Sequence, residues 1–151
     1  LVFGQNHIRA AVADFTFTSK LVDGKFPDYN RVLPKGGNKV ILGDCQALKQ
    51  GFSRASILSN EKYRGVRVVL TNGELRIFAN NPEQEEAEEV VAVDYQGDEL
   101  EMGFNVSYLI DVLSTLRSRQ AKITLLDANN SALIESGDES NAMYVVMPMR
   151  L

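Results

Sequence analysis

Residues 38–151 contain an internal repeat, which limits the folds that the chain can adopt. Each copy reads as one strand, one helix and three further strands, and Gly43 and Gly103 stand at equivalent points sixty residues apart. A repeat of this length is typical of two packed copies of one supersecondary unit. The two copies share few identical residues, so the repeat rests on its pattern of apolar and polar residues. We therefore predict an α+β fold.

The first copy has a clear sequence of signals. Asp44 can cap a helix, and the pair Asn72-Gly73 predicts a tight hairpin. The apolar face of that helix is formed by Cys45, Leu48, Phe52 and Ala55. The predicted strands are residues 40–43, 66–71, 75–79 and 87–95.

The second copy repeats these signals. Asn105 can cap a second helix, which follows a strand over residues 100–103. The apolar face of the helix is formed by Val106, Leu109, Val112, Leu113 and Leu116. The remaining predicted strands are residues 123–125, 132–134 and 144–147.

Residues 1–29 resemble the end of a third copy. Three strands are predicted, over residues 1–3, 7–12 and 15–22, without the strand and helix that open the other copies. A connector rich in Pro and Gly follows, from Phe26 to Gly37. We therefore expect residues 1–29 to be the C-terminal part of a truncated domain and residues 30–151 to be a complete one.

Charge is distributed unevenly along the chain. The net charge is −4, but residues 82–101 hold nine acidic residues and no Lys or Arg. The rest of the chain, with 16 basic residues, is mildly basic. The acidic run Glu83–Glu89 fits either a solvated strand edge that blocks unwanted pairing or a docking surface for a basic partner.

Signals for catalysis, metal binding and membrane insertion are weak. His7 stands without a cluster of further ligands, and Cys45, the single cysteine, lies on the predicted apolar helix face. The chain has no nucleophile-elbow, P-loop or dinucleotide-binding motif. It has no signal peptide and no apolar run approaching about 18 residues. We expect no catalytic residue, no metal, no cofactor, no membrane contact and a cytoplasmic location.

The C-terminus, residues 144–151, stays apolar to its last residue. Chain ends are usually polar and frayed. Two methionines flank a proline here, and methionine suits surfaces that accept several ligands. An ordinary last strand and an adaptable binding surface are both consistent with these residues.

Five stretches of the sequence resemble the bacterial DNA polymerase III beta subunit, the sliding-clamp family. They are in the family's order and spread over the whole chain. The stretches are residues 17–29 (FTSKLVDGKFPDY), 57–62 (ILSNEK), 80–89 (NNPEQEEAEE), 103–108 (GFNVSY) and 144–151 (YVVMPMRL).

The resemblance implies a DNA-clamp fold, with helices on one face and antiparallel sheets on the other. Members of the family form a head-to-tail ring dimer that encloses duplex DNA and slides along it without base readout. The DNA would be faced by Lys49, Arg54, Arg117 and Arg119. The ring contact would be made by Ile57, Leu58, Glu83, Glu85, Glu86, Glu88 and Glu89.

The resemblance also implies a pocket for short linear motifs of DNA polymerase III subunits, the clamp loader and repair polymerases. Its residues here would be Pro27, Arg31, Val32, Asn105, Tyr108, Ser131, Val145, Val146, Met147, Pro148, Met149 and Arg150. Two other readings remain open, an interaction module without a role on DNA and an enzyme with an unrecognised site. A basic channel in an assembled ring would favour the clamp, and convergent titratable groups in a pocket would favour the enzyme.

Overall fold

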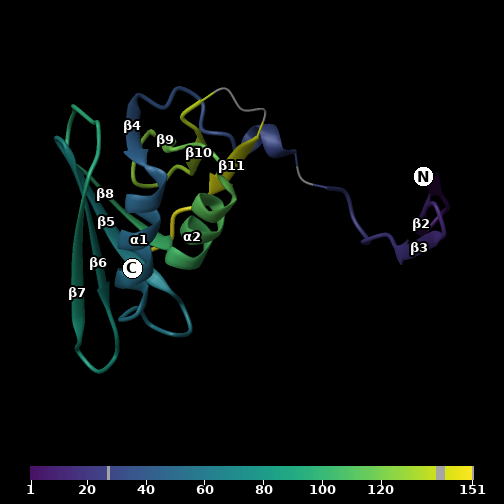
Figure 1. Cartoon of the computed structure of the whole chain (residues 1–151), viewed down its shortest axis with the longest axis horizontal. Helices are drawn as coiled ribbons and strands as arrows, with labels where there is room; N and C mark the ends of the chain where they lie inside the picture. Colours follow the sequence, from purple (N-terminus) through teal and green to yellow (C-terminus); the bar gives the residue numbers. More distant parts are fainter. Residues whose placement is uncertain (27, 139–141, 151) are drawn as a thin grey trace.

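The computed structural model describes residues 1–26, 28–138 and 142–150. It contains helices and antiparallel strands, and confirms the predicted α+β class (Figure 1). The helices are α1 (Cys45–Ser56) and α2 (Val106–Thr115), with a short 3-10 turn at Tyr29–Arg31. The strands are β1 (Val2–Phe3), β2 (His7–Val12), β3 (Phe15–Lys20), β4 (Lys39–Asp44), β5 (Gly65–Thr71), β6 (Glu74–Asn80), β7 (Glu86–Ala92), β8 (Leu100–Asn105), β9 (Gln120–Leu125), β10 (Ala132–Ser136) and β11 (Met143–Val146).

The two repeated units exchange their first strands. One four-stranded sheet has the order β11-β10-β9-β4 and the other has the order β7-β6-β5-β8. β4 therefore joins the strands of the second unit, with Ile41 opposite Ile123, and β8 joins those of the first, with Met102 opposite Val68. The repeat itself was predicted, but the exchange was not, because strand pairing between distant segments leaves no mark on local periodicity.

Backbone hydrogen bonds also link the edges of the two sheets. The N–H of Leu42 donates to the carbonyl of Asp94 at 3.0 Å, and the N–H of Asp94 donates back at 2.7 Å. On the other side, the N–H of Met149 donates to the carbonyl of Gly103 at 2.9 Å. The sequence predicted a strand that extends to Tyr95, but β7 ends at Ala92. The first link explains the difference, because the chain leaves β6 there and turns toward β4.

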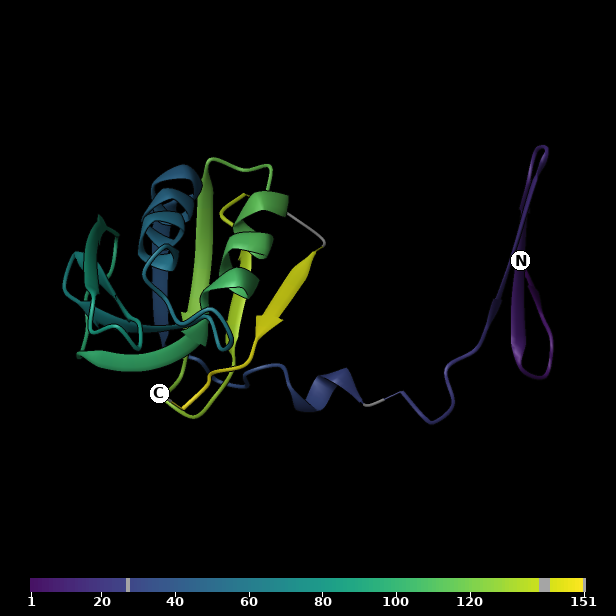
Figure 2. The same ribbon diagram turned by 90° about the horizontal axis from the view of Figure 1, so that it is seen from below.

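Both helices begin where the sequence predicted. The Asp44 carboxylate accepts hydrogen bonds from the N–H groups of Gln46 and Ala47, and the Asn105 side-chain oxygen accepts one from Ser107. α1 contacts α2, β4, β6 and β7, whereas α2 also contacts β8 and β11. Figure 2 shows the two helices side by side, with β9 to β11 alongside them.

One continuous core lies between the helices and the two four-stranded sheets. The predicted apolar face of α1 is buried, and Cys45 lies within it, as expected for a structural cysteine. The largest fully buried side chains of the core are Ile41, Leu48, Leu70, Ile77, Ile134, Val66 and Val106. In the described part of the chain, no helix is long and apolar enough to cross a membrane.

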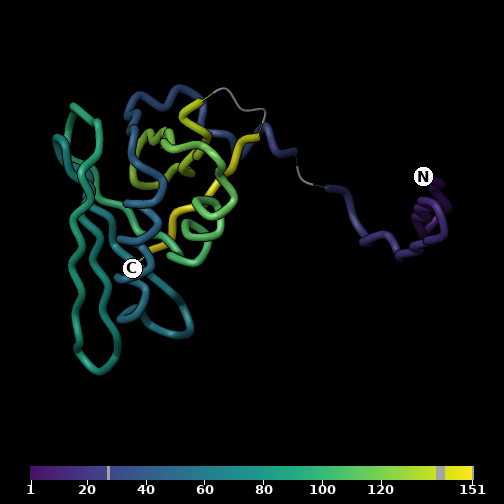
Figure 3. The backbone as a smooth tube through the Cα atoms, viewed as in Figure 1, coloured from purple at the N-terminus to yellow at the C-terminus, as the bar shows by residue number. Residues whose placement is uncertain are grey.

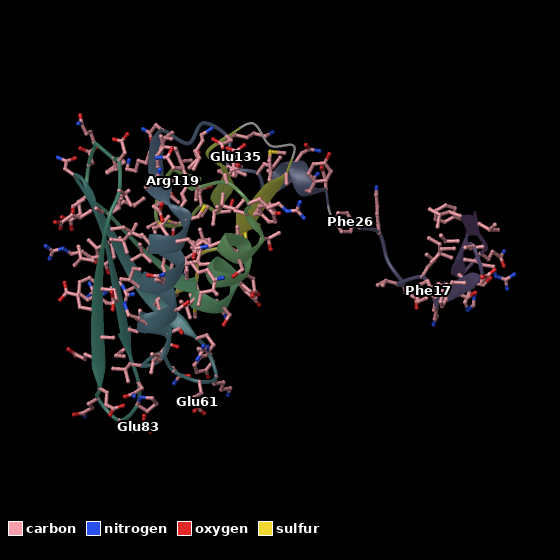
Figure 4. All side chains as sticks on the ribbon, in the orientation of Figure 1. Phe17, Phe26, Glu61, Glu83, Arg119 and Glu135 are labelled. Carbon is pink, nitrogen blue, oxygen red and sulfur yellow. The ribbon has the colours of Figure 1, made fainter. Side chains whose placement is uncertain are left out.

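The three N-terminal strands form a separate sheet of order β1-β2-β3. An extended connector separates it from the body of the molecule (Figure 3). One face of this sheet is apolar, because Phe3 pairs with Ile8 and Phe17 pairs with Ala10. Phe17 is 65% exposed and lies far from the helices (Figure 4), so the described residues give this sheet no core of its own.

Candidate functional site

The C-terminal tail, residues 147–150, leads from one sheet to the other. β11 ends at the buried Val146, and the side chain of Met147 behind it is 58% exposed. Pro148 has no N–H with which to extend the ladder. Met149 instead donates its N–H to Gly103 on β8. The tail therefore lies against β8 with Met147 open to solvent.

Ser131 attaches the connector to the body beside this tail. Its side chain is buried, and its hydroxyl donates a hydrogen bond to the carbonyl of Val32 at 2.6 Å. The next residue, Ala132, pairs with Val146 in the sheet. The structure therefore brings Val32, Ser131 and the start of the tail together, although Ser131 is engaged with the backbone rather than free for a ligand.

Asn105 and Tyr108 bring α2 to the other end of the tail. The Asn105 side-chain oxygen caps α2, and its amide donates to the carbonyl of Tyr63 at 3.4 Å. Tyr108 lies one turn into the helix and is more than half exposed. Since Gly103 binds Met149, these residues lie near the tail's end, with Tyr108 presenting the accessible side chain.

The remaining predicted pocket residues are less constrained. Arg31 is exposed and lies 3.9 Å from the Asp28 carboxylate. Val145 is half-buried on β11, and Arg150 is exposed at the end of the tail. Pro27 lies outside the described residues. The accessible side chains among these described residues are apolar or cationic.

A second surface is formed by β7, the edge strand of its sheet, whose outer edge is covered by no strand among the described residues. Side chains alternate along it, so Glu86 and Glu88 point away from the helices while Glu89 points toward α1. Glu88 lies 3.8 Å from Arg76 on β6. Glu83 lies at the tip of the β6–β7 hairpin (Figure 4). Nearby, the Asn81 side-chain amide donates a hydrogen bond to the Glu85 carboxylate, and the Glu85 N–H donates one to the Asn81 side-chain oxygen.

Arg54 and Glu89 form a two-pronged ion pair between α1 and β7. The Arg54 Nε donates to Glu89 Oε1 and Nη2 donates to Oε2, both at 2.8 Å. The hydrogen bonds lower the pKa of Glu89 and raise the pKa of Arg54. From the resemblance, Arg54 was expected to face DNA and Glu89 to lie in the ring contact. Strand alternation indicates that Glu89 lies on the same face as the buried Val91, but it does not identify Arg54 as its partner.

The four predicted DNA-facing cations differ in their surroundings. Lys49 is half-buried on α1, and Arg117 is exposed just after α2. In the described ranges neither has a carboxylate within ion-pair distance. Arg119 lies 3.7 Å from Asp44, and Arg54 is paired with Glu89. Lys49 and Arg117 therefore keep the most available charge.

A shallow hollow of about 730 Å³ lies on the outer face of the β5–β8 sheet and was not predicted. The Arg67 guanidinium lies 4.3 Å from the centre of the Phe78 ring and 3.4 Å from the Glu101 carboxylate. Among the residues described, no three potential metal ligands cluster together.

Comparisons with known proteins agree with this architecture. The sequence profile described as "DNA polymerase III beta subunit, C-terminal domain" matches residues 30–150. The chain is 62% identical over 151 residues to the beta sliding clamp of Pseudomonas aeruginosa, covering 100% of this chain and 41% of that protein. It is 57% identical over 148 residues to the beta sliding clamp of Escherichia coli, covering 98% of this chain and 40% of that protein.

Solved structures give the same result. A crystal structure of the Pseudomonas aeruginosa sliding clamp superposes with a TM-score of 0.92 at 62% identity, over 99% of this chain and 41% of that one. A Bartonella birtlesii clamp reaches 0.91 at 37% identity, over 98% of this chain and 40% of that one. The fold is thus that of a DNA sliding clamp. The chain belongs to the family of the DNA polymerase III beta subunit and spans about two fifths of the length of the curated relatives it matches.

Proposed function

We propose that this chain is the C-terminal part of a sliding clamp, a processivity factor that encloses duplex DNA as a ring dimer. Residues 1–29 would complete a preceding clamp domain, and residues 30–151 would form the last one. Family membership supports this proposal, and so does the arrangement of α1 beside α2, with Lys49 and Arg117 unpaired in the described ranges. Attraction to phosphates needs no base contact and allows sliding.

The tail and its neighbours would capture short linear motifs of DNA polymerase III subunits, the clamp loader and repair polymerases. The observation that carries this proposal is the exposed Met147 on a tail fixed at both ends, by Val146 in β11 and by Met149 on β8. A fixed backbone with a flexible apolar side chain suits several peptides at low ordering cost. Such a clamp tethers other enzymes in the cytoplasm and catalyses no reaction itself.

Replacing Met147 and Met149 by Ala in a full-length clamp with this sequence tests the proposal. Each buried methylene contributes about 0.8 kcal/mol, so the affinity for a labelled Gln-containing clamp-binding peptide should fall roughly tenfold or more. Met143→Ala is the matched control, because Met143 is 55% exposed but lies at the far end of β11. Unchanged peptide affinity together with a large drop in melting temperature would show that the tail is core.

A further inference from the structure

The predicted ring-contact surface is built from two elements that are distant in the sequence. Ile57 and Leu58 follow the C-terminal end of α1, and the acidic residues lie on and before β7. A partner subunit can meet both parts at once only if α1 and β7 keep a fixed relation. The single cysteine, Cys45, is free, so no disulfide sets that relation, and packing and polar contacts between α1 and β7 must do so.

Packing fixes how closely α1 approaches β7. A Cβ atom added at Gly51 would lie 2.7 Å from a methyl group of Val91, so the helix backbone lies directly on the strand. Apolar contacts of this kind set the depth of the helix but resist sliding along the strand less strongly, because they are not directional.

The Arg54–Glu89 ion pair supplies the directional contact that resists sliding of α1 along β7. Two parallel hydrogen bonds join the guanidinium to both carboxylate oxygens at 2.8 Å, a geometry that lysine cannot reproduce. Arg54 lies one helical turn before Ile57. Glu89 lies next in sequence to Glu88, which faces the opposite side of the strand. The pair therefore connects the apolar part of the surface to its acidic part.

We propose, on the basis of the proposed clamp function, that Arg54 is a positioning residue for ring closure. Through Glu89 it fixes the position of β7 relative to Ile57 and Leu58, so that both parts of the surface meet the partner subunit together. This assigns Arg54 to the ring contact rather than to DNA. It also assigns Glu89 to an internal ion pair rather than to a basic residue of the partner.

The two earlier assignments fit the geometry less well. The charge of Arg54 is balanced by a carboxylate at hydrogen-bonding distance, so the pair attracts phosphates less than an unpaired arginine would. The Glu89 side chain is 23% exposed and both its oxygens already accept hydrogen bonds from Arg54. If a cation of the partner replaced Arg54 at Glu89, Arg54 would lose its carboxylate partner.

The test is a charge swap in a full-length clamp that carries this sequence as its C-terminal part. The variants are Arg54→Glu, Glu89→Arg and the double swap, and subunit exchange between labelled rings is measured at low salt. Each single variant should accelerate exchange roughly tenfold, and the double variant should return to within about twofold of wild type. Arg54→Lys, which keeps the charge but not the fork, should be intermediate.

The matched control is the Lys122–Glu135 pair. Its atoms lie 3.3 Å apart, its side chains are 42% and 25% exposed, and it joins β9 to β10 in the other four-stranded sheet. Swapping its charges should leave ring exchange unchanged. The melting temperature of each variant, measured in parallel, reports any general loss of stability.

Several results would overturn the inference. If Glu89→Arg weakens the ring while Arg54→Glu is silent, Glu89 meets a cation of the partner. If Arg54→Glu only shortens retention on nicked circular DNA, Arg54 acts on DNA. If the single variants lower the melting temperature without changing exchange, the pair is merely structural. A wild-type subunit that forms no ring would contradict the proposed function itself, whereas a stable ring indifferent to both single variants would overturn this inference alone.

Discussion

The N-terminal sheet and the body of this chain use the same kinds of residue to opposite effect. Phe17 on β3 is 65% exposed, whereas Phe52 on α1 is 2% exposed. Both regions alternate apolar and polar side chains along their strands, but only the body has helices and a second sheet to cover the apolar face. Alternation therefore identifies the face that a strand can bury, and the cover decides whether it contributes stability.

The largest difference should appear when a phenylalanine is removed from each region. Phe52→Ala should destabilise the chain by about 3–5 kcal/mol, because a cavity is left in a closed core. Phe17→Ala should cost little, since the ring is mostly in water already. Urea unfolding followed by circular dichroism measures both, and equal losses would contradict the contrast between the two regions.

Hydrogen exchange should sharpen the same contrast without mutation. Over the residues that the structure describes, the β2–β3 ladder pairs only with β1, whereas β5 and β6 lie inside the four-stranded sheet on the core. Amides of β5 and β6 should be protected on the order of a hundredfold more than those of β2 and β3. Similar protection factors in the two ladders would show that the N-terminal sheet is covered in solution.

A smaller effect is expected at the attachment of the connector. Ser131→Ala removes the donor to the Val32 carbonyl and should cost about 1 kcal/mol of unfolding free energy. It should also increase proteolysis near residues 28–32. Ser114→Ala, at an exposed site on α2, is the control and should be close to neutral. Unchanged proteolysis in Ser131→Ala would show that this hydrogen bond does not hold the connector.

The smallest effect concerns pH. Arg54 lowers the pKa of Glu89, so the stability contributed by Glu89 is present above the ordinary glutamate pKa and is lost as pH falls through its lowered pKa. The difference in unfolding midpoint between wild type and Arg54→Ala should therefore shrink on acidification. Arg117→Ala, with an exposed arginine, should differ from wild type by the same amount at each pH. A constant difference for Arg54→Ala would contradict the assigned pKa shift.

Local signals in the sequence predicted the elements of the body well. Asp44 and Asn105 cap the two helices, and the Asn72-Gly73 hairpin joins β5 to β6, because capping and turn chemistry depend on a few adjacent residues. The strand exchange and the Arg54–Glu89 pair were missed. Both depend on contacts between residues far apart in the chain, which periodicity does not encode.

The predicted binding residues illustrate the same limit. The assignments to the tail came from a resemblance, and their role in binding stays a prediction. The structure adds what the sequence could not: the Ser131 hydroxyl and the Asn105 amide hold the backbone around the tail, while Met147 and Tyr108 offer exposed surface. Residue type alone could not separate the supporting side chains from the accessible ones.

The exchange of β4 and β8 has a consequence for how such a domain arises. The first strand of each repeated unit pairs in the sheet of the other unit. A single unit by itself would therefore have a three-stranded sheet and an unpaired first strand. Two identical copies would complete each other's sheets by swapping those strands about a two-fold axis. The present body has the architecture of that swapped pair, with residues 93–99 as the covalent link between its halves. Gene duplication and fusion of a small self-associating ancestor would produce this interlocked arrangement directly.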